Sequence, residues 1–154
     1  MRPPFVIHGN RDLIPLEGVR AALRKEESNM KTIDNESTLV VVRGYHLSWT
    51  SGSFEDAVRF LAPDLKVEVP INDYPTTESF ARALVGFGSL VKSTTLLAEF
   101  VQGTEAMLLY DMEVDRVGTM RIAEHFTVAD GRITRLRQIH DTAVLRAAGF
   151  ETAS

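Results

Sequence analysis

Residues Gly118 to Asp141 read GTMRIAEHFTVADGRITRLRQIHD, and this stretch decides the fold. Two runs of alternating apolar and polar residues flank Ala129-Asp130-Gly131. Asp-Gly between such runs is a strong hairpin signal, because glycine readily adopts the positive φ that the turn requires. The stretch therefore predicts a long antiparallel hairpin. Its arms also carry ionisable residues among apolar ones, which indicates a sheet face that is either a core or a pocket; these are Glu124, His125, His140 and Asp141.

The composition predicts one soluble domain with a small set of possible partners. The chain has 154 residues, 44% of them hydrophobic, which is the usual size of a single domain. Proteins bind nucleic acid through basic surfaces, so the formal net charge of -4 does not favour nucleic acid as a partner. There is no cysteine, which excludes disulfides, thiolate zinc sites and thiol nucleophiles and is compatible with a reducing cytoplasm. Because no long apolar run occurs, we expect a cytoplasmic protein that does not enter a membrane.

The first 33 residues differ in character from the rest of the chain. Leu16, Val19 and Leu23 are spaced as one helical face in LEGVRAALRKEE. We expect residues 1–33 to form an arm with a short helix, which packs on the domain, exchanges with a neighbouring subunit or is partly disordered. The main domain is expected over residues 34–150, and residues 151–154 form a tail.

The main domain is expected to begin with two helices. Asp34 or Ser37 can cap a helix that carries TLVVVRGYHLSWTSG. The valines favour a strand, but the helical spacing of apolar residues continues for three turns until Gly52. A second helix, FEDAVRFLA, is expected to end before Pro63.

The remaining elements are mainly strands. LKVEV (residues 65–69) alternates and stops at Pro70, and Thr77 is expected to cap a helix, ESFARALVGF. The runs 94–102 and 105–114 predict another hairpin, and TAVLRAAGF predicts a last short helix. Helices first and antiparallel strands afterwards are typical of an α+β domain, in which helices cover one face of a curved antiparallel sheet.

Three segments carry a family resemblance: YHLSWTSGSFEDAVRFLAPDLKVEVP, GTEAMLLYDMEV and EHFTVADGRITRLRQIHD. Their order and spacing resemble the SnoaL-like branch of the nuclear transport factor 2-like superfamily, whose relatives include ketosteroid isomerases, polyketide cyclases and limonene epoxide hydrolase. The resemblance implies a cone of N-terminal helices and curved antiparallel sheet around a cavity. It also implies a homodimer through the outer sheet face. Such a fold hosts enzymes, binding modules and scaffolds, so it does not by itself give the function.

The isomerase residues are only partly present. Tyr45 matches the tyrosine with which the resembling isomerases donate a hydrogen bond to an enolate oxygen. Their catalytic aspartate corresponds to Val69, which cannot take a proton, and their second oxyanion donor falls near Ile122 or Ala123. A steroid-isomerase mechanism is therefore not expected.

The epoxide hydrolase set is also broken. The resembling enzymes activate water with an Asp-Arg-Asp set, and Asp111 matches one of the two aspartates. Leu109 stands in place of the arginine and Gln138 in place of the second aspartate. Glu68 falls where these enzymes hold water with an asparagine.

Resemblance to the cyclases implies a single acid as base near the last strands, with a histidine nearby. We expect a bulge after Ile133 and a three-residue turn with Gly131 left-handed, which places Glu124 opposite Leu136. An error of one residue in register would turn such residues outward. With this register the cavity side carries Asp111, Glu124, Gln138 and His140, with Trp49, Glu68, Met107, Leu109 and Ile122 as further ligand-binding candidates.

Three functional readings remain open. In the first, a SnoaL-like isomerase, cyclase or hydrolase uses Asp111 or Glu124 as base on an apolar, carbonyl-bearing substrate, with His140 as partner and Tyr45 stabilising the oxyanion. In the second, the cavity of a dimer binds an apolar molecule without turning it over. In the third, the protein is a scaffold whose centre is filled by Trp49, Phe87, Leu109 and Phe126.

Each candidate residue also has a plain structural interpretation. Tyr45 can be a core residue, and Asp111 and Glu124 can be members of ion pairs. His125 is expected on the outer face of the sheet. The histidines at 8, 46, 125 and 140 have no metal-binding spacing, so neither a metal nor a cofactor is expected.

Overall fold

The structure is a computed structural model, and it describes residues 15–150. The chain divides into two units, Met1–Met30 and Lys31–Ser154. The beginning of the expected arm, residues 1–14, and the expected tail, residues 151–154, lie outside the described residues.

Helix α1 (Leu16–Thr50) is a single helix, so the expected break with a new N-cap at Asp34 or Ser37 is wrong. No glycine or proline occurs between Gly18 and Gly44 to interrupt it. The Ser37 hydroxyl donates to the Asp34 carbonyl oxygen at 3.1 Å, which is a bond within the helix and not a cap.

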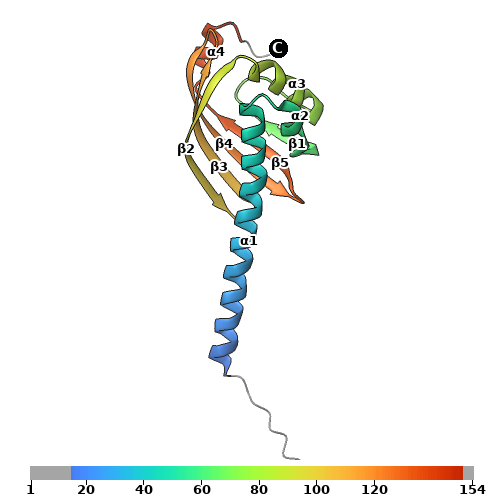
Figure 1. Cartoon of the computed structure of the whole chain (residues 1–154), viewed down its shortest axis with the longest axis vertical. Coiled ribbons are helices and arrows are strands. Elements are labelled where there is room, and N and C mark those ends of the chain that lie inside the picture. The colour runs from blue at the N-terminus through green and yellow to red at the C-terminus, as the bar shows by residue number, and fades with distance from the viewer. Residues whose placement is uncertain (1–14, 151–154) are drawn as a thin grey trace, which may run out of the picture. The chain divides into compact units, whose positions relative to one another are not determined.

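The second unit contains one five-stranded sheet with the order β1-β5-β4-β3-β2 (Figure 1). Strands β2 to β5 form antiparallel pairs, whereas β1 pairs parallel with β5. The sheet is therefore mixed, and the expectation of a wholly antiparallel sheet is wrong. The expected α+β fold is confirmed. The strands are β1 (Leu61–Glu68), β2 (Val91–Gln102), β3 (Glu105–Val114), β4 (Gly118–Ala129) and β5 (Arg132–Ile139).

The other helices are short: α2 (Phe54–Arg59), α3 (Thr77–Gly88) and α4 (Ala143–Ala147). Thr76, and not Thr77, caps α3, because its side chain accepts from the Ser79 backbone N–H at 3.1 Å. The Thr77 hydroxyl instead donates to the Ala62 carbonyl at 2.8 Å and ties α3 to β1. None of the described helices combines the length and hydropathy of a membrane-spanning segment.

The central hairpin turns on Asp130 and Gly131, whose φ angles are 51° and 73°. Ala129 pairs with Arg132, so the turn has two residues and not the three expected. The expected bulge is confirmed, because Val128 pairs with Ile133 whereas Thr127 pairs with Arg135.

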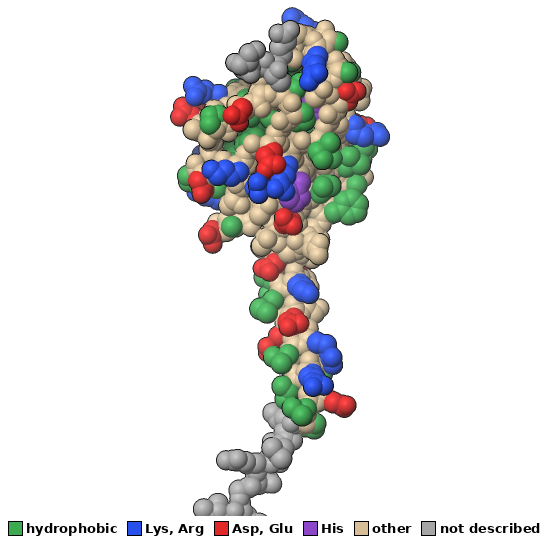
Figure 2. Space-filling model, turned by 180° about the vertical axis from the view of Figure 1, so that it is seen from behind, with side chains coloured by type: hydrophobic (Ala, Val, Ile, Leu, Met, Phe, Trp, Pro, Cys, Tyr) green, Lys and Arg blue, Asp and Glu red, His purple; other side chains and the backbone are tan. Residues whose placement is uncertain are grey.

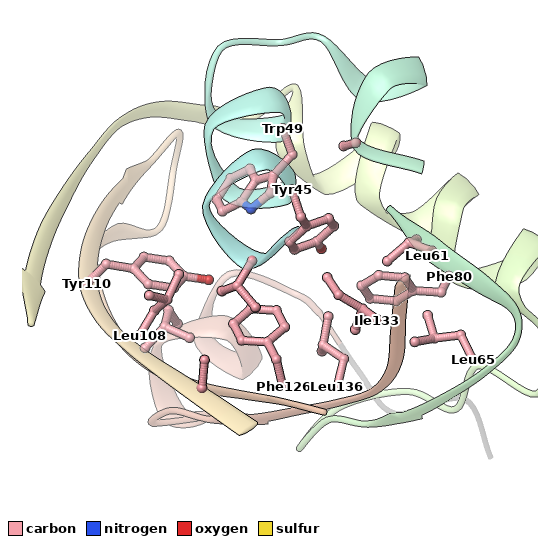
Figure 3. Close-up of a cluster of buried hydrophobic side chains, with 14 of the residues drawn as sticks. Tyr45, Trp49, Leu61, Leu65, Phe80, Leu108, Tyr110, Phe126, Ile133 and Leu136 are labelled. Atoms are coloured by element: carbon pink, nitrogen blue, oxygen red, sulfur yellow. The ribbon is translucent and has the colours of Figure 1, made fainter. Parts of the chain in front are cut away.

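The core lies between the sheet and the helices of the second unit (Figure 3). Tyr45 and Trp49 project from α1 toward Tyr110 and Phe126 of the sheet. The other labelled core residues come from β1, α3, β3 and β5 and are Leu61, Leu65, Phe80, Leu108, Ile133 and Leu136. Burial of such large apolar side chains is the main stabilising contribution to the fold.

Two side chains of α1 hold the turn between β2 and β3. The buried Thr38 hydroxyl donates to the Gly103 carbonyl oxygen at 2.7 Å. The Gly103 backbone N–H donates to Asn35 Oδ1 at 2.6 Å. Both polar groups of this backbone residue are therefore paired with the helix.

We predict that Thr38→Val lowers the free energy of unfolding by about 1–2 kcal/mol, because valine keeps the volume but leaves the Gly103 carbonyl without its donor. Urea unfolding followed by the fluorescence of Trp49, the chain's single tryptophan, measures the change. Ser37→Ala is the matched control, since the Ser37 hydroxyl bonds only within α1. Equal unfolding midpoints for both variants would contradict the prediction.

Candidate functional site

A pocket of about 320 Å³ lies between the inner face of the sheet, the end of α1 and helix α3. Most of its lining is apolar or aromatic, including Tyr45, Trp49, Phe80, Tyr110 and Ile122. The polar side chains in the lining are Glu124, Gln138, His140 and Asn72. A mostly apolar pocket with a few polar groups is typical of sites for small molecules.

Glu124 is the buried carboxyl of this pocket, with only 1% of the residue exposed. It lies directly opposite Gln138 across β4 and β5, not opposite Leu136 as expected, and the Gln138 amide donates to Glu124 Oε2. Glu124 Oε1 has no hydrogen-bond partner among the described residues. Desolvation by burial raises the pKa of Glu124 from its ordinary value of 4.5 to about 7, against the lowering effects of Gln138 and Tyr110. Both protonation states are therefore accessible near neutral pH.

Tyrosine and tryptophan side chains that can donate hydrogen bonds also line this pocket. Burial, followed by the nearby charge of Glu124, raises the pKa of Tyr45 and of Tyr110 well above the ordinary value, so both hydroxyls stay protonated at neutral pH. The Trp49 indole N–H is buried without a hydrogen-bond partner among the described residues. The pocket thus combines one titratable acid with several neutral donors.

His140 lies in the pocket lining and is half-buried. Its Nδ1 lies 3.0 Å from the Asp141 carbonyl oxygen, and within the described chain no hydrogen bond joins its ring to Glu124. Asp141 Oδ1 accepts from the Ala143 N–H at 2.8 Å, at the start of α4. The structure therefore places His140, but not Asp141, with the pocket residues.

Asp111 is on the outer face of the sheet, so its expected place on the cavity side is wrong. Its carboxylate accepts two hydrogen bonds from Arg121, at 2.7 and 2.9 Å, and this pairing lowers the pKa of Asp111. Met107 and Leu109 share this face, while Leu108 and Tyr110 are buried on the other. Residues 108 and 109 are both apolar, so alternation by itself does not decide which of the two side chains faces the pocket.

The remaining candidates divide between the pocket and the surface. Ile122 lines the pocket as expected. Glu68 lies outside the pocket and accepts from Arg135 at 3.0 Å and Arg137 at 3.1 Å; the hydrogen bond from Arg135 is the main cause of its lowered pKa. Leu109 faces away from the pocket, so it cannot fill the centre together with Trp49 and Phe87, which line it.

Two buried residues of this region were missed from the sequence. Tyr110 contacts the Glu124 carboxyl. It was not a candidate because alternation was expected to place Leu109, and not Tyr110, on the cavity side of β3. The ring of His46 packs edge-on against Trp49 and Tyr110, with ring centroids 5.4 and 4.8 Å away. Burial lowers the pKa of His46 from 6.5 to about 4, so the ring is neutral at physiological pH. His125 is partly buried on the outer sheet face, as expected, with Nε2 3.6 Å from Glu105.

Within residues 15–150, no cluster of three or more histidine, cysteine or carboxylate side chains is arranged to hold a metal ion.

Solved structures with similar folds come from several bacteria. A protein of Kribbella flavida DSM 17836 is 33% identical, with a TM-score of 0.66, covering 71% of this chain and 91% of that one. A nuclear transport factor 2-like protein of Cytophaga hutchinsonii ATCC 33406 is 17% identical, with a TM-score of 0.64 and coverages of 71% and 94%. An epoxide hydrolase resembling limonene epoxide hydrolase, from M. tuberculosis, is 16% identical, with a TM-score of 0.61 and coverages of 74% and 90%.

A match to a protein-family profile is more direct evidence of family membership than these similarities of fold. Among curated proteins, no sequence matches the chain. The profile of the SnoaL-like domain matches residues 41–136, which is more than half of the chain and includes Tyr45, Trp49, Tyr110 and Glu124. The chain therefore belongs to the SnoaL-like domain family.

Proposed function

We propose that the pocket binds a small apolar molecule with a carbonyl group and that Glu124 exchanges a proton with it. The observation that supports this most is the buried Glu124 carboxyl, which has a pKa of about 7 and one oxygen without a partner among the described residues. A carboxyl that titrates near neutral pH is suited to general acid–base catalysis, because it can both take and return a proton.

The neighbours of Glu124 supply the other parts of such a reaction. Glu124 removes a proton next to the carbonyl, and the Tyr45 hydroxyl donates to the oxygen on which negative charge develops. Gln138 holds Glu124 Oε2, which leaves Oε1 for the substrate. His140 is half-buried in the pocket lining, where it would pass protons between the pocket and water. The proposed reaction is therefore a proton transfer of the kind that isomerases, cyclases or hydrolases catalyse.

Binding without turnover is the second candidate function. Val69, at the position of the isomerase base, lines the pocket with a side chain that cannot accept a proton. Asp111, the match to the hydrolase aspartate, is paired with Arg121 outside the pocket. Glu124 is therefore the one carboxyl in the described lining, and a neutral Glu124 could simply donate a hydrogen bond to a ligand.

We predict that Glu124→Gln lowers turnover of the active member of a panel of small ketones, lactones and epoxides by about 10²- to 10⁴-fold. Ligand affinity, followed by quenching of Trp49 fluorescence, should change by less than about threefold, because glutamine keeps the size and polarity of the side chain. Asp111→Asn is the matched control and should keep full activity. Binding without turnover by the parent protein would favour the second function, and full activity of Glu124→Gln would exclude Glu124 as the base.

The raised pKa of Glu124 also predicts how the free energy of unfolding depends on pH. Its folded pKa of about 7 lies above its ordinary 4.5, so the folded protein holds this proton more tightly than the unfolded chain. This contribution is complete below pH 4.5 and is lost as the pH rises through about 7, at a total of about 3 kcal/mol. The free energy of unfolding of Glu124→Gln, minus that of the parent, should therefore increase by about this amount between pH 4.5 and about pH 8.

This difference must be measured between variants, because His46 has the opposite effect on the parent protein. Its lowered pKa means that stability is lost as the pH falls from 6.5 toward about 4. Since His46 is present in both proteins, its contribution cancels in the difference, which urea titrations at several pH values measure. A difference that stays constant with pH would show that Glu124 is not proton-coupled to folding.

We also propose that two copies associate through the outer face of the sheet. Phe100, Met107 and Ile139 are exposed there, and Phe100 lies opposite Met107 across β2 and β3. Figure 2 shows apolar side chains gathered beside a group of charged ones on this unit. Exposed apolar side chains gathered on one face are typical of an interaction surface.

If the sheet face is an interface, Phe100→Glu should weaken association by at least about tenfold, because it places a charge among apolar side chains. Sedimentation velocity over a range of concentrations measures this. Arg82→Glu, an exposed substitution on α3 and away from the outer sheet face, is the control. Identical sedimentation of the parent and Phe100→Glu proteins would exclude Phe100 from any interface.

A further inference from the structure

Helix α1 carries large apolar side chains that no described residue covers. Five of them, which we call the seam, are between 39% and 75% exposed: Leu16, Val19, Leu23, Met30 and Ile33. Figure 2 shows uncovered apolar side chains along this helix. They follow one another in steps of three, four, seven and three residues, and Val40 and Leu47, also exposed, continue at intervals of seven.

This spacing is the heptad repeat of a coiled coil, in which apolar residues alternate at intervals of three and four. A helical segment of this length without packing is only marginally stable in water, so a long helix with an uncovered seam indicates a partner helix. Residues 16–40 also precede the part of the chain that matches the SnoaL-like profile, residues 41–136. The seam is thus an addition to the domain and not part of its core.

The charges along this part of α1 indicate the partner and its direction. Residues 16–25 carry the basic Arg20, Arg24 and Lys25 against one acid, Glu17. Residues 26–36 carry one base, Lys31, against four acids, which are Glu26, Glu27, Asp34 and Glu36. Two parallel copies would place like charges side by side, whereas two antiparallel copies place the basic half of each helix beside the acidic half of the other.

The apolar residues fit the same antiparallel arrangement. When the segments Leu16–Ile33 of two copies overlap fully, Leu16 lies opposite Ile33 and Val19 opposite Met30 of the second copy. Arg20 then flanks Glu27 of the second copy, and this contact occurs twice by symmetry. The layer of Leu23 with Glu26 of the second copy, which also occurs twice by symmetry, is polar, and a polar residue in a seam is a known means of selecting one register.

From these observations we propose that α1 binds the α1 helix of a second copy of this chain, in an antiparallel coiled coil through the seam. This surface is separate from the outer sheet face and from the pocket. The proposal does not depend on the proposed chemistry of Glu124.

Disulfide trapping tests the arrangement directly, because the chain contains no cysteine of its own. Full-length Val19→Cys and Met30→Cys proteins are mixed and oxidised under mild conditions, and the products are identified by intact mass. The mixed disulfide should exceed each same-variant disulfide by at least about fivefold. Ala21→Cys, an exposed position of α1 off the seam, is the control and should trap little. Dominant same-variant dimers would indicate parallel pairing, and trapping no greater than the control would refute pairing through the seam.

Charge exchange tests the electrostatic part of the proposal. The measurements use the Phe100→Glu background, in which the sheet face is disabled, and sedimentation equilibrium gives the dissociation constant. Arg20→Glu and Glu27→Arg should each weaken association by about tenfold, because two attractive contacts become repulsive. The double variant restores opposite charges and should return to within about threefold of the background protein. A background protein that is monomeric at all concentrations, or a double variant weaker than both single variants, would overturn the proposal.

Discussion

The pairing of strands β4 and β5 is the constraint on which the candidate site depends. The two-residue turn at Asp130 and Gly131, followed by the bulge near Ile133, sets Glu124 opposite Gln138. Since side chains alternate between the two faces of a strand, this register directs both residues into the pocket. The Gln138 amide then holds one carboxyl oxygen, while the apolar neighbours remove water from both. Without this register the pocket would have no buried acid.

Two ionisable side chains are buried in or beside the pocket, and burial of such groups costs free energy of folding. Glu124 is buried and its pKa is raised, whereas His46 is buried and its pKa is lowered, so both groups favour their neutral forms. They affect stability in opposite directions as the pH changes, which reduces the net pH dependence of the whole protein between about 4.5 and 6.5. Near neutral pH, Glu124 is the group that remains poised to titrate. The proposed chemical role of Glu124 rests on this property.

Much of the architecture could be predicted from local patterns. Asp130-Gly131 between alternating runs indicated the hairpin, and the order of helices and strands indicated an α+β domain. The errors arose where a local pattern has two solutions of similar strength. Leu108 and Leu109 are both apolar, so the direction of β3 was wrong, and with it the place of Asp111 and the role of Tyr110. Ser37 is a good capping residue, but with no helix breaker near it α1 continues, and its hydroxyl bonds to Asp34 instead.

The sequence by itself determined the hairpins and a set of ionisable residues from which a site could be built, because these follow from spacing along one segment. The order and spacing of several segments indicated the family, and the resemblance to that family implied the bulge. Only the tertiary structure decided that Glu124 is enclosed while Asp111 and Glu68 pair with arginines on the surface. The physical reason is that burial and pKa depend on neighbours from other segments. Tyr45 on α1, Tyr110 on β3 and Gln138 on β5 are brought to Glu124 only by the folded sheet and helix, and no pattern within β4 records their presence.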